Sequence, residues 1–336
     1  MHIGHISAMC LFSTSLTPLP VPDTIEVTYG LDHMFGHPET KIDGSVLTVP
    51  LCPAVEKLKP FRVNMHLSPC TAYEMGDVFH NWFSVRFGFE VKLLYIGNSR
   101  RKVLGNLPPP QKAVEGDHWI LFAVSLVTLL VVTSICLLMP SPNSWYSILV
   151  MSMLGPCGFM LLPTRVSNMK QTVDANVSIT FADLAPYLVV SRRSWQNVQD
   201  RLPEGEVVDI TKFRPNIVVE GADEAFEEDF WAELEIGGLT KVLLTQNCAR
   251  CASLNVDYST GKPGLGQAGK ILKLLSSDRR VDPGTKWSPV FGRYGFLAPL
   301  QSKKVSDNPG VYIAAGQEVR VRRRNEQRTI IGIYDN

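Results

Sequence analysis

Apolar and polar residues alternate in short runs along the first third of the chain, a pattern that is typical of β-strands. Glycine, proline or aspartate bounds each of these runs, which cover residues 24–28, 46–49, 62–66 and 91–96. Four aromatic residues recur at helical spacing between them: Phe79, Trp82, Phe83 and Phe87. Asp77 precedes them as a candidate N-cap. We therefore expect a β-rich unit with one helix over residues 24–110. Residues 1–23 have weak periodicity and several prolines, so we expect them to be poorly ordered.

Strand-like runs resume over residues 177–324. Residues 217–219 and 241–244 are short apolar runs, and residues 311–314 and 319–323 read as closing strands. We interpret the arginines of the last run as a solvated strand edge rather than a nucleic-acid patch. These arginines are Arg320, Arg322, Arg323 and Arg324. Together with the first unit, these runs indicate a mainly β (α+β) fold.

Three helices are expected in the same region. Ser191 or Ser194 could cap a helix that runs to Leu202. Residues 266–276 supply an apolar face for a second short helix. Residues 223–234 predict a third, acidic helix with its aromatic side chains turned inward and its acidic face solvated.

An uncharged block separates the two regions. Residues 118–164 contain no Asp, Glu, Lys or Arg, and residues 119–139 form a 21-residue apolar run, long enough for a bilayer core that takes about 20 residues. A second, weaker apolar run follows a Pro-Ser-Pro-Asn break, and basic residues flank the block on both sides. The pattern predicts a transmembrane hairpin over residues 118–163 with both soluble flanks on the cytosolic side. The alternative is a mispredicted exon or retained intron, because the block divides two segments typical of soluble protein.

Composition narrows the function classes. The 336 residues suffice for about two domains. A formal net charge of +1 gives no global field that would attract nucleic acid. Seven cysteines, an odd number at irregular spacing, favour a reduced compartment over a disulfide framework. The start of the chain shows no basic n-region of a secretory signal.

The candidate chemistry is concentrated in Asn247-Cys248-Ala249-Arg250-Cys251. A structural zinc site needs four ligands, and no second pair of cysteines or histidines at suitable spacing is evident. A thioredoxin-like redox pair belongs at a helix start, whereas the residues after Cys251 read as a turn. In the third interpretation, one thiolate ligates a cofactor metal while a neighbouring guanidinium grips a phosphate. Arginine would also lower the pKa of the thiol and favour the ligating thiolate.

Several motifs occur together and in order across residues 177–324. They are Arg214-Pro215-Asn216-Ile217-Val218, Glu227-Glu228-Asp229-Phe230-Trp231, Cys248-Ala249-Arg250-Cys251, Asn255-Val256-Asp257, Thr260-Gly261 and Pro289-Val290-Phe291-Gly292. This order resembles the MOSC domain, the C-terminal module of molybdenum cofactor sulfurase, and most closely a fungal member of the branch that contains the mitochondrial amidoxime-reducing component. Gly76-Asp77 and Trp82-Phe83-Ser84 resemble the latter part of the N-terminal β-barrel domain of that branch.

The resemblance implies a MOSC β-barrel with short helices, preceded by a partial N-terminal β-barrel domain and interrupted by the apolar insertion. It implies that Cys251 ligates the molybdenum of molybdopterin and is the catalytic residue. Arg214 and Asn216 match positions that contact the pterin or its phosphate, and Ala249 and Arg250 match positions beside the metal ligand. Ala249 replaces a serine of some relatives, so only its backbone could contribute. Cys248 would be a supporting thiol that does not ligate the metal.

By the same resemblance, the protein would be a molybdenum-dependent oxidoreductase that reduces N-hydroxylated compounds. Electrons would come from NADH through a cytochrome b5 and its reductase. We expect a membrane-associated protein with soluble domains facing the cytosol, and the mitochondrial outer membrane fits this expectation. One alternative is a sulfur-carrier module that is served in trans by a pyridoxal phosphate domain.

Another alternative is a cofactor-free, degenerate, membrane-tethered relative. It is motivated by the first strand of the family's N-terminal barrel, whose Pro-x-Lys-Ser-like turn and Gly-Leu…Asp-Arg segment are not found in this chain.

Overall fold

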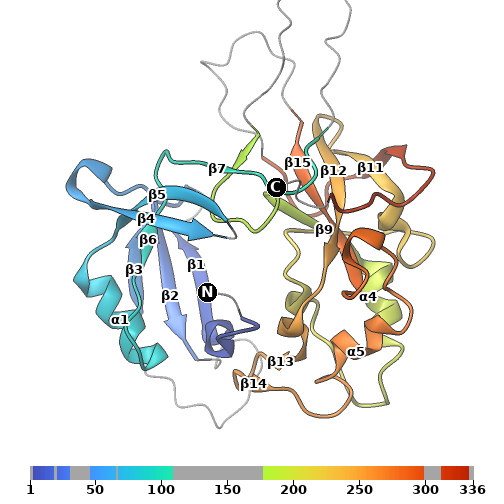
Figure 1. The fold of residues 1–336 in the computed structure, drawn as a ribbon, viewed down its shortest axis with the longest axis horizontal. Helices are drawn as coiled ribbons and strands as arrows, with labels where there is room; N and C mark the ends of the chain where they lie inside the picture. Colours follow the sequence, from blue (N-terminus) through green and yellow to red (C-terminus); the bar gives the residue numbers. More distant parts are fainter. Residues whose placement is uncertain are drawn as a thin grey trace, which may run out of the picture. The chain divides into compact units, whose positions relative to one another are not determined.

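The computed structural model describes residues 3–18, 21–30, 46–65, 67–108, 177–298 and 312–332 (Figure 1). A mixed six-stranded sheet, with the strand order β10-β9-β15-β12-β11-β16, is the main element of the second half of the chain. Its strands are β9 (Tyr187–Ser191), β10 (Ile217–Val219), β11 (Trp231–Ile236), β12 (Thr240–Ala249), β15 (Val290–Leu297) and β16 (Val319–Arg324). β9 and β10 pair in parallel, and the other neighbours pair antiparallel. The prediction of a mainly β fold with short helices is confirmed.

The inner strands of this sheet are buried on both faces, whereas the edge strand β16 is largely exposed. In β9, Leu188 and Val190 belong to one apolar cluster and Val189 belongs to another, because successive side chains of a strand point to opposite faces. The first cluster packs the sheet against α4 (Arg192–Gln199) and α5 (Ile271–Ser276). The second gathers apolar side chains of the sheet itself around the buried Trp231. Because β9 is covered on both faces, apolar side chains occupy every position of residues 187–190 instead of alternating with polar ones.

The described residues of the first half of the chain contain two three-stranded antiparallel sheets and one α-helix. The sheets are formed by β1 (Phe12–Thr17), β2 (Thr24–Tyr29) and β3 (Leu47–Pro50), and by β4 (Lys59–Met65), β5 (Ser68–Glu74) and β6 (Leu94–Tyr95). The predicted helix is α1 (Asp77–Phe87), although Gly76 occupies the N-cap position rather than Asp77. Its aromatic side chains pack against a core that contains Val27, Leu47 and Met75.

Residues 12–17 lie in a segment that the sequence predicts to be poorly ordered, and they form β1. All six residues pair in register with β2. The ring of Phe12 lies 4.9 Å from the rings of Tyr29 and Phe87, measured between centroids. Aromatic packing from residues distant in the sequence therefore orders a segment whose own pattern is weak.

Short elements complete the fold. They are the 3-10 helices η1 (Ser7–Leu11), η2 (Val55–Lys57), η3 (Ile210–Phe213), η4 (Glu227–Phe230), η5 (Ala252–Asn255) and η6 (Pro283–Thr285), and the strands β7 (Arg101–Lys102), β8 (Ser178–Ile179), β13 (Val256–Asp257) and β14 (Lys262–Pro263). β7 pairs with β8 across the uncharged block. The buried Arg101 strengthens this junction, because its guanidinium donates to the carbonyl oxygens of Met65, Thr180 and Ala182.

The helix predictions after residue 190 have mixed outcomes. Ser191 does cap α4, since its side chain accepts a hydrogen bond from Arg193 N at 3.1 Å. The helix expected over residues 266–276 begins only at Ile271, after the positive-φ Gly266. Residues 312–314 are not in a strand, whereas β16 is an edge strand of the sheet, as predicted.

The acidic helix predicted over residues 223–234 is wrong. Phe226 adopts a left-handed conformation (φ 66°), a single 3-10 turn follows, and β11 begins at Trp231. The expectation of a solvated acidic face is also wrong, because Glu228 and Asp229 are 0% exposed. Buried carboxylates need partners of their own, and those partners define the centre of this half of the molecule.

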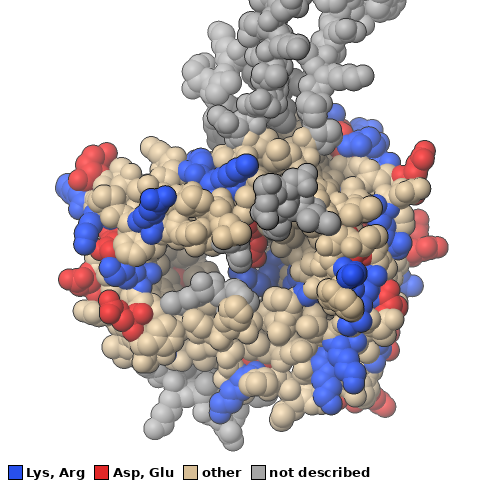
Figure 2. All heavy atoms as spheres, viewed as in Figure 1, with Lys and Arg blue, Asp and Glu red and all other residues tan. Residues whose placement is uncertain are grey.

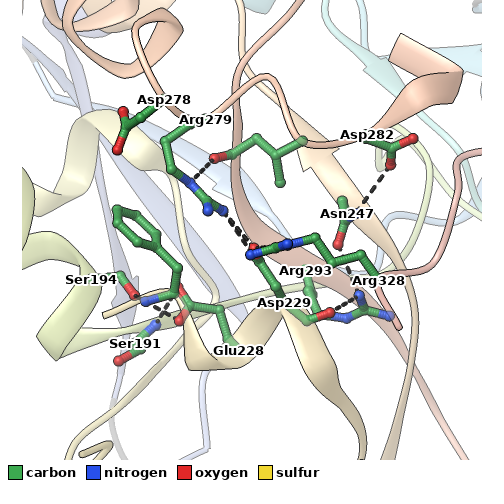
Figure 3. Close-up of polar contacts among 12 residues, drawn as sticks. Ser191, Ser194, Glu228, Asp229, Asn247, Asp278, Arg279, Asp282, Arg293 and Arg328 are labelled. Carbon is green, nitrogen blue, oxygen red and sulfur yellow. Dashed lines mark hydrogen bonds and ion pairs between the residues drawn. The ribbon is translucent and has the colours of Figure 1, made fainter. Parts of the chain in front are cut away.

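Asp229 is the hub of a buried ion network (Figure 3). Arg279 Nη2 donates to both carboxylate oxygens at 2.9 and 2.7 Å, and Arg328 Nε donates to Oδ2 at 2.8 Å. The buried Arg293 donates to the backbone carbonyl of Asp229 at 2.6 Å. Three arginines from separate parts of the chain thus converge on η4.

The network continues to the end of β12. Arg293 Nη1 also donates to Asn247 Oδ1 at 2.8 Å, and Asn247 Nδ2 donates to Asp282 Oδ2 at 3.1 Å and to the carbonyl of Thr329 at 2.9 Å. Asp282 in turn accepts from the backbone of Gly284 and Ile331. The C-terminal described segment is therefore fixed against the strand that leads into the cysteine motif.

The predicted hairpin over residues 118–163 lies outside the described residues. Among the helices of the described ranges, none combines the length and apolar character needed to span a bilayer.

We expect Asp229→Ala to lower the free energy of unfolding by about 3–5 kcal/mol, because it leaves buried guanidinium groups without their counter-charge. Chemical denaturation of the purified chain measures this. Glu220→Ala is the matched control: Glu220 is 73% exposed and pairs with Arg192 at 3.3 Å, so its loss should change the free energy by less than about 1 kcal/mol. Equal effects for the two variants would contradict the assigned role of Asp229.

Glu228 provides a second prediction, on pH. Burial raises the pKa of its carboxyl above the ordinary value of 4.5, although the hydrogen bond from Ser194 Oγ (2.6 Å) opposes the shift. The folded state therefore holds this proton more tightly than the unfolded chain, and the stabilisation is lost as the pH rises above about 4.5. We expect Glu228→Gln to gain stability relative to the wild type as the pH increases. A difference that is constant from pH 4 to pH 8 would contradict this.

Candidate functional site

The end of β12 places the two cysteines in different environments. The ladder with β15 shifts register between Asn247 and Ala249, which turns Cys248 into the apolar cluster around Phe213 and Phe291. Cys248 is 2% exposed, whereas Cys251 is exposed at the start of η5. The sulfur of Cys251 lies 3.2 Å from Ser253 Oγ. Of this pair, the thiol of Cys251 is the one open to a ligand.

Arg250 is a buried cation behind these thiols. Its Nη1 donates to the sulfur of Cys248 at 3.0 Å, and its Nη2 donates to the carbonyl of Phe213 at 2.8 Å. Burial alone would lower the pKa of this guanidinium, but Cys248 and Tyr294 outweigh burial and hold the pKa above its ordinary value. Only Nε is left without a protein partner in the described residues. Arg250 thus contributes a fixed positive charge. Only its Nε–H remains to donate to a ligand, so it cannot bind a phosphate through both Nη atoms.

Arg214 has the opposite character. It caps η3 in a left-handed conformation (φ 54°), and its backbone N–H donates to the carbonyl of Thr211 at 2.8 Å. A left-handed backbone is uncommon for a residue with a long side chain, and such positions cluster at ligand sites. Its side chain is exposed, and within the described ranges no protein group holds the guanidinium. This fork is available to a phosphate or carboxylate.

Asn216 and Ala249 differ in what they can offer. The side-chain oxygen of Asn216 accepts from Leu188 N at 2.8 Å, while its backbone N–H donates to the carbonyl of Leu188 at 2.9 Å. Asn216 therefore aligns β10 with β9 and keeps only its amide nitrogen for a ligand. Ala249 is exposed at the end of β12, opposite Val290.

Two tyrosines at the site were not singled out by the sequence. η3, whose C-cap is Arg214, contacts η5, whose N-cap is Cys251. Tyr258 follows η5 closely in the sequence, and the charges of Arg214, Arg250 and Cys251 affect the pKa of its phenol. Tyr294 hydrogen-bonds Cys248, and burial raises the pKa of its phenol far above the ordinary range. A tyrosine in a turn and one in a strand are common features, so only the folded arrangement identifies them.

The visible face of the molecule carries charges of both signs. On the face shown in Figure 2, basic and acidic side chains are interspersed over the described residues. Within those same residues, no group of three or more His, Cys, Asp or Glu could hold a metal ion.

Comparison with known proteins gives one family and a set of relatives. A family model described as the MOSC domain matches residues 176–320. "Mitochondrial amidoxime reducing component 2" of Bos taurus is 36% identical over 153 residues, which cover 44% of this chain and 43% of that protein. "Mitochondrial amidoxime-reducing component 1" of Homo sapiens is 35% identical over 133 residues, or 38% of this chain and 37% of that one. "Molybdenum cofactor sulfurase" of Oryza sativa subsp. japonica is 26% identical over 153 residues, which cover 44% of this chain and 18% of that protein. The chain thus spans less than half the length of these relatives.

The burial difference predicts selective alkylation. Iodoacetamide should modify Cys251 in the native protein and Cys248 only after unfolding, because a thiol packed in the core is not accessible. Peptide mapping by mass spectrometry measures both sites in one sample, and the exposed Cys52 reports that the reagent is active. Equal labelling of Cys248 and Cys251 in the folded protein would refute the geometry given above.

Proposed function

We propose, from the premise that residues 176–320 form a MOSC domain, that this chain binds molybdopterin-held molybdenum and acts as an oxidoreductase. The observation that carries the proposal is the exposed thiol of Cys251 at the N-cap of η5, which contacts η3, the element that ends at the exposed Arg214. A soft sulfur donor beside a phosphate-binding fork is the donor set that a phosphorylated metal cofactor requires.

The residues present fit such a group. Cys251 offers one protein sulfur, and Arg214 offers a bidentate donor with no competing protein partner in the described residues. Two more donors, Arg250 Nε and the Tyr258 hydroxyl, are buried without partners there. Unpaired buried donors are costly unless a ligand or water satisfies them, so their presence on two residues around Cys251 supports a bound polar group.

Each residue then has a distinct role. Cys251 would hold the metal through its sulfur, and Arg214 would bind the phosphate, assisted by the amide of Asn216. Arg250 would keep a positive charge behind the site while its bond to Cys248 holds that thiol away from the metal. Ala249 would present only its backbone. When bound, the cofactor supplies the oxidation–reduction chemistry, and the protein binds and orients it.

The names of the relatives support a substrate class, and the electron source is proposed from the family resemblance alone. Relatives named amidoxime-reducing components support the reduction of N-hydroxylated compounds, with removal of the oxygen atom from nitrogen. Electrons would come from NADH through a cytochrome b5 and its reductase. The same names support a mitochondrial location.

A sulfur-carrier function is the second candidate, supported by the open thiol of Cys251 and the match to molybdenum cofactor sulfurase. The thiolate of Cys251 would attack the terminal sulfur of a donor persulfide. The sulfur would pass to Cys251 as a new persulfide, and the donor would leave as a thiol. Intact-mass analysis would detect this persulfide, whereas molybdenum without a persulfide supports the reductase.

We expect Cys251→Ala to lose bound molybdenum and amidoxime reduction by more than about 100-fold, since removing outer-shell partners alone costs roughly 10–100-fold in metal proteins. Elemental analysis and turnover of an aromatic amidoxime with the reductase system measure the two effects. Cys52→Ala is the matched control, because Cys52 is also exposed and lies outside the site. Full molybdenum content and full activity in Cys251→Ala would overturn the proposal.

A further inference from the structure

Tyr258 combines a polar hydroxyl with a position where no protein group binds it. The oxygen atom is shielded from solvent and has no hydrogen-bond partner among the described residues. Nearly all buried hydroxyl groups are paired, so an unpaired one indicates a missing ligand, ion or water.

The groups around this hydroxyl indicate the chemistry of the missing partner. Cys10 Sγ lies 3.9 Å from the carbonyl oxygen of the preceding Asp257, and η3, which ends at Arg214, contacts η5, which begins after Cys251. The charges of Arg214 and Arg250 and the thiols of Cys10 and Cys251 accordingly affect the pKa of the phenol. Burial raises the pKa of the phenol to about 12, even though the guanidinium of Arg214 favours ionisation. Tyr258 is therefore a neutral donor at physiological pH, near two cations, and the complementary partner is an oxygen that carries negative charge.

The fold fixes the turn that carries Tyr258. The carboxylate of Asp257 accepts hydrogen bonds from the backbone N–H and the hydroxyl of Ser259, both at 2.8 Å, and from Thr260 Oγ1 at 3.1 Å. On the outer side, η1 contacts β14. Leu11 of η1 packs so closely on the positive-φ Gly261 that a Cβ there would lie 3.0 Å from its methyl group. The backbone turn that carries Tyr258 is thus fixed before any ligand arrives, which reduces the entropy lost on binding.

We propose that Tyr258 is a binding residue whose hydroxyl donates a hydrogen bond to an oxyanion held beside Cys251 and Arg214. The inference rests on the proposed function only for the identity of that oxyanion, which would be a phosphate oxygen or a metal-bound oxygen of the cofactor. Both present the same chemistry to a phenol. The hydroxyl of Tyr258 supplies an uncharged hydrogen-bond donor, whereas the guanidinium of Arg214 supplies the positive charge.

Tyr258→Phe tests this, because it keeps the ring and removes only the donor. Orthophosphate and molybdate are the two probes, and the readout is the concentration of each that half-protects Cys251 of the full chain from alkylation. We expect the half-protecting concentration to rise about tenfold in the variant, the effect of losing one hydrogen bond to a charged group. A shift with phosphate alone assigns the donor to the phosphate end, and a shift with molybdate alone assigns it to the metal end.

A second measurement separates ligand binding from a structural role. Since the hydroxyl has no partner in the part of the protein that the structure describes, Tyr258→Phe should leave the thermal midpoint of the ligand-free protein unchanged or raise it. Tyr312→Phe, at a residue that is 84% exposed, is the control for both assays and should alter neither. A lowered thermal midpoint in Tyr258→Phe would overturn the inference. So would half-protecting concentrations that match the wild type, or a wild type that neither anion protects.

The molybdenum content of the wild type tests the proposed function independently. If the protein carries molybdenum and Tyr258→Phe binds both anions normally, the proposed function stands and the role of Tyr258 fails. If the protein carries no molybdenum but phosphate protection depends on Tyr258, the oxyanion site stands and the molybdenum function fails.

Discussion

The buried carboxylate of Asp229 is the interaction on which the second half of the molecule depends. It lies fully out of water and is bound by Arg279 and Arg328, while Arg293 binds the adjacent backbone carbonyl. Arg293 also binds Asn247, the residue directly before Cys248. A break in this network would leave buried charges unpaired, which costs far more than the loss of a surface pair. The position of the cysteine motif is therefore set by charges that lie outside it.

Arg250 lies between Cys248 and Cys251 in the sequence and treats their thiols differently. Arg250 uses two of its nitrogens on Cys248 and on the carbonyl of Phe213, so it holds the inner thiol and leaves the outer one free. The side chain of Arg214, the left-handed C-cap of η3, is exposed and has no protein partner among the described residues. A site that binds a charged group needs both kinds of arginine: one that shapes the protein and one that meets the ligand.

The sequence was informative where the pattern is local. Alternation located β2, β3, β4 and β16, and the helical spacing of aromatic residues located α1. It failed at residues 227–229, where neighbouring acidic residues are typical of a solvated face. The arginines that neutralise Asp229 lie 50 and 99 residues away along the chain, so no window of the sequence could reveal them. Tyr258 was missed for a similar reason, because its importance lies in its neighbours and in the lack of a partner. The roles of Cys251, Arg214 and Asn216 came from the resemblance and remain proposals.

The short β7–β8 pair bears on how the length of the chain between these two strands can vary. Lys102 lies opposite Ser178, and Arg101 lies opposite Ile179, so the chain leaves and re-enters the folded unit at adjacent points. The length of the chain that joins these two strands contributes only a slowly growing closure entropy. Splice variants that shorten or replace the intervening segment could therefore keep the same junction. Natural variation in length should be concentrated there, leaving the chemistry of the cysteine loop undisturbed.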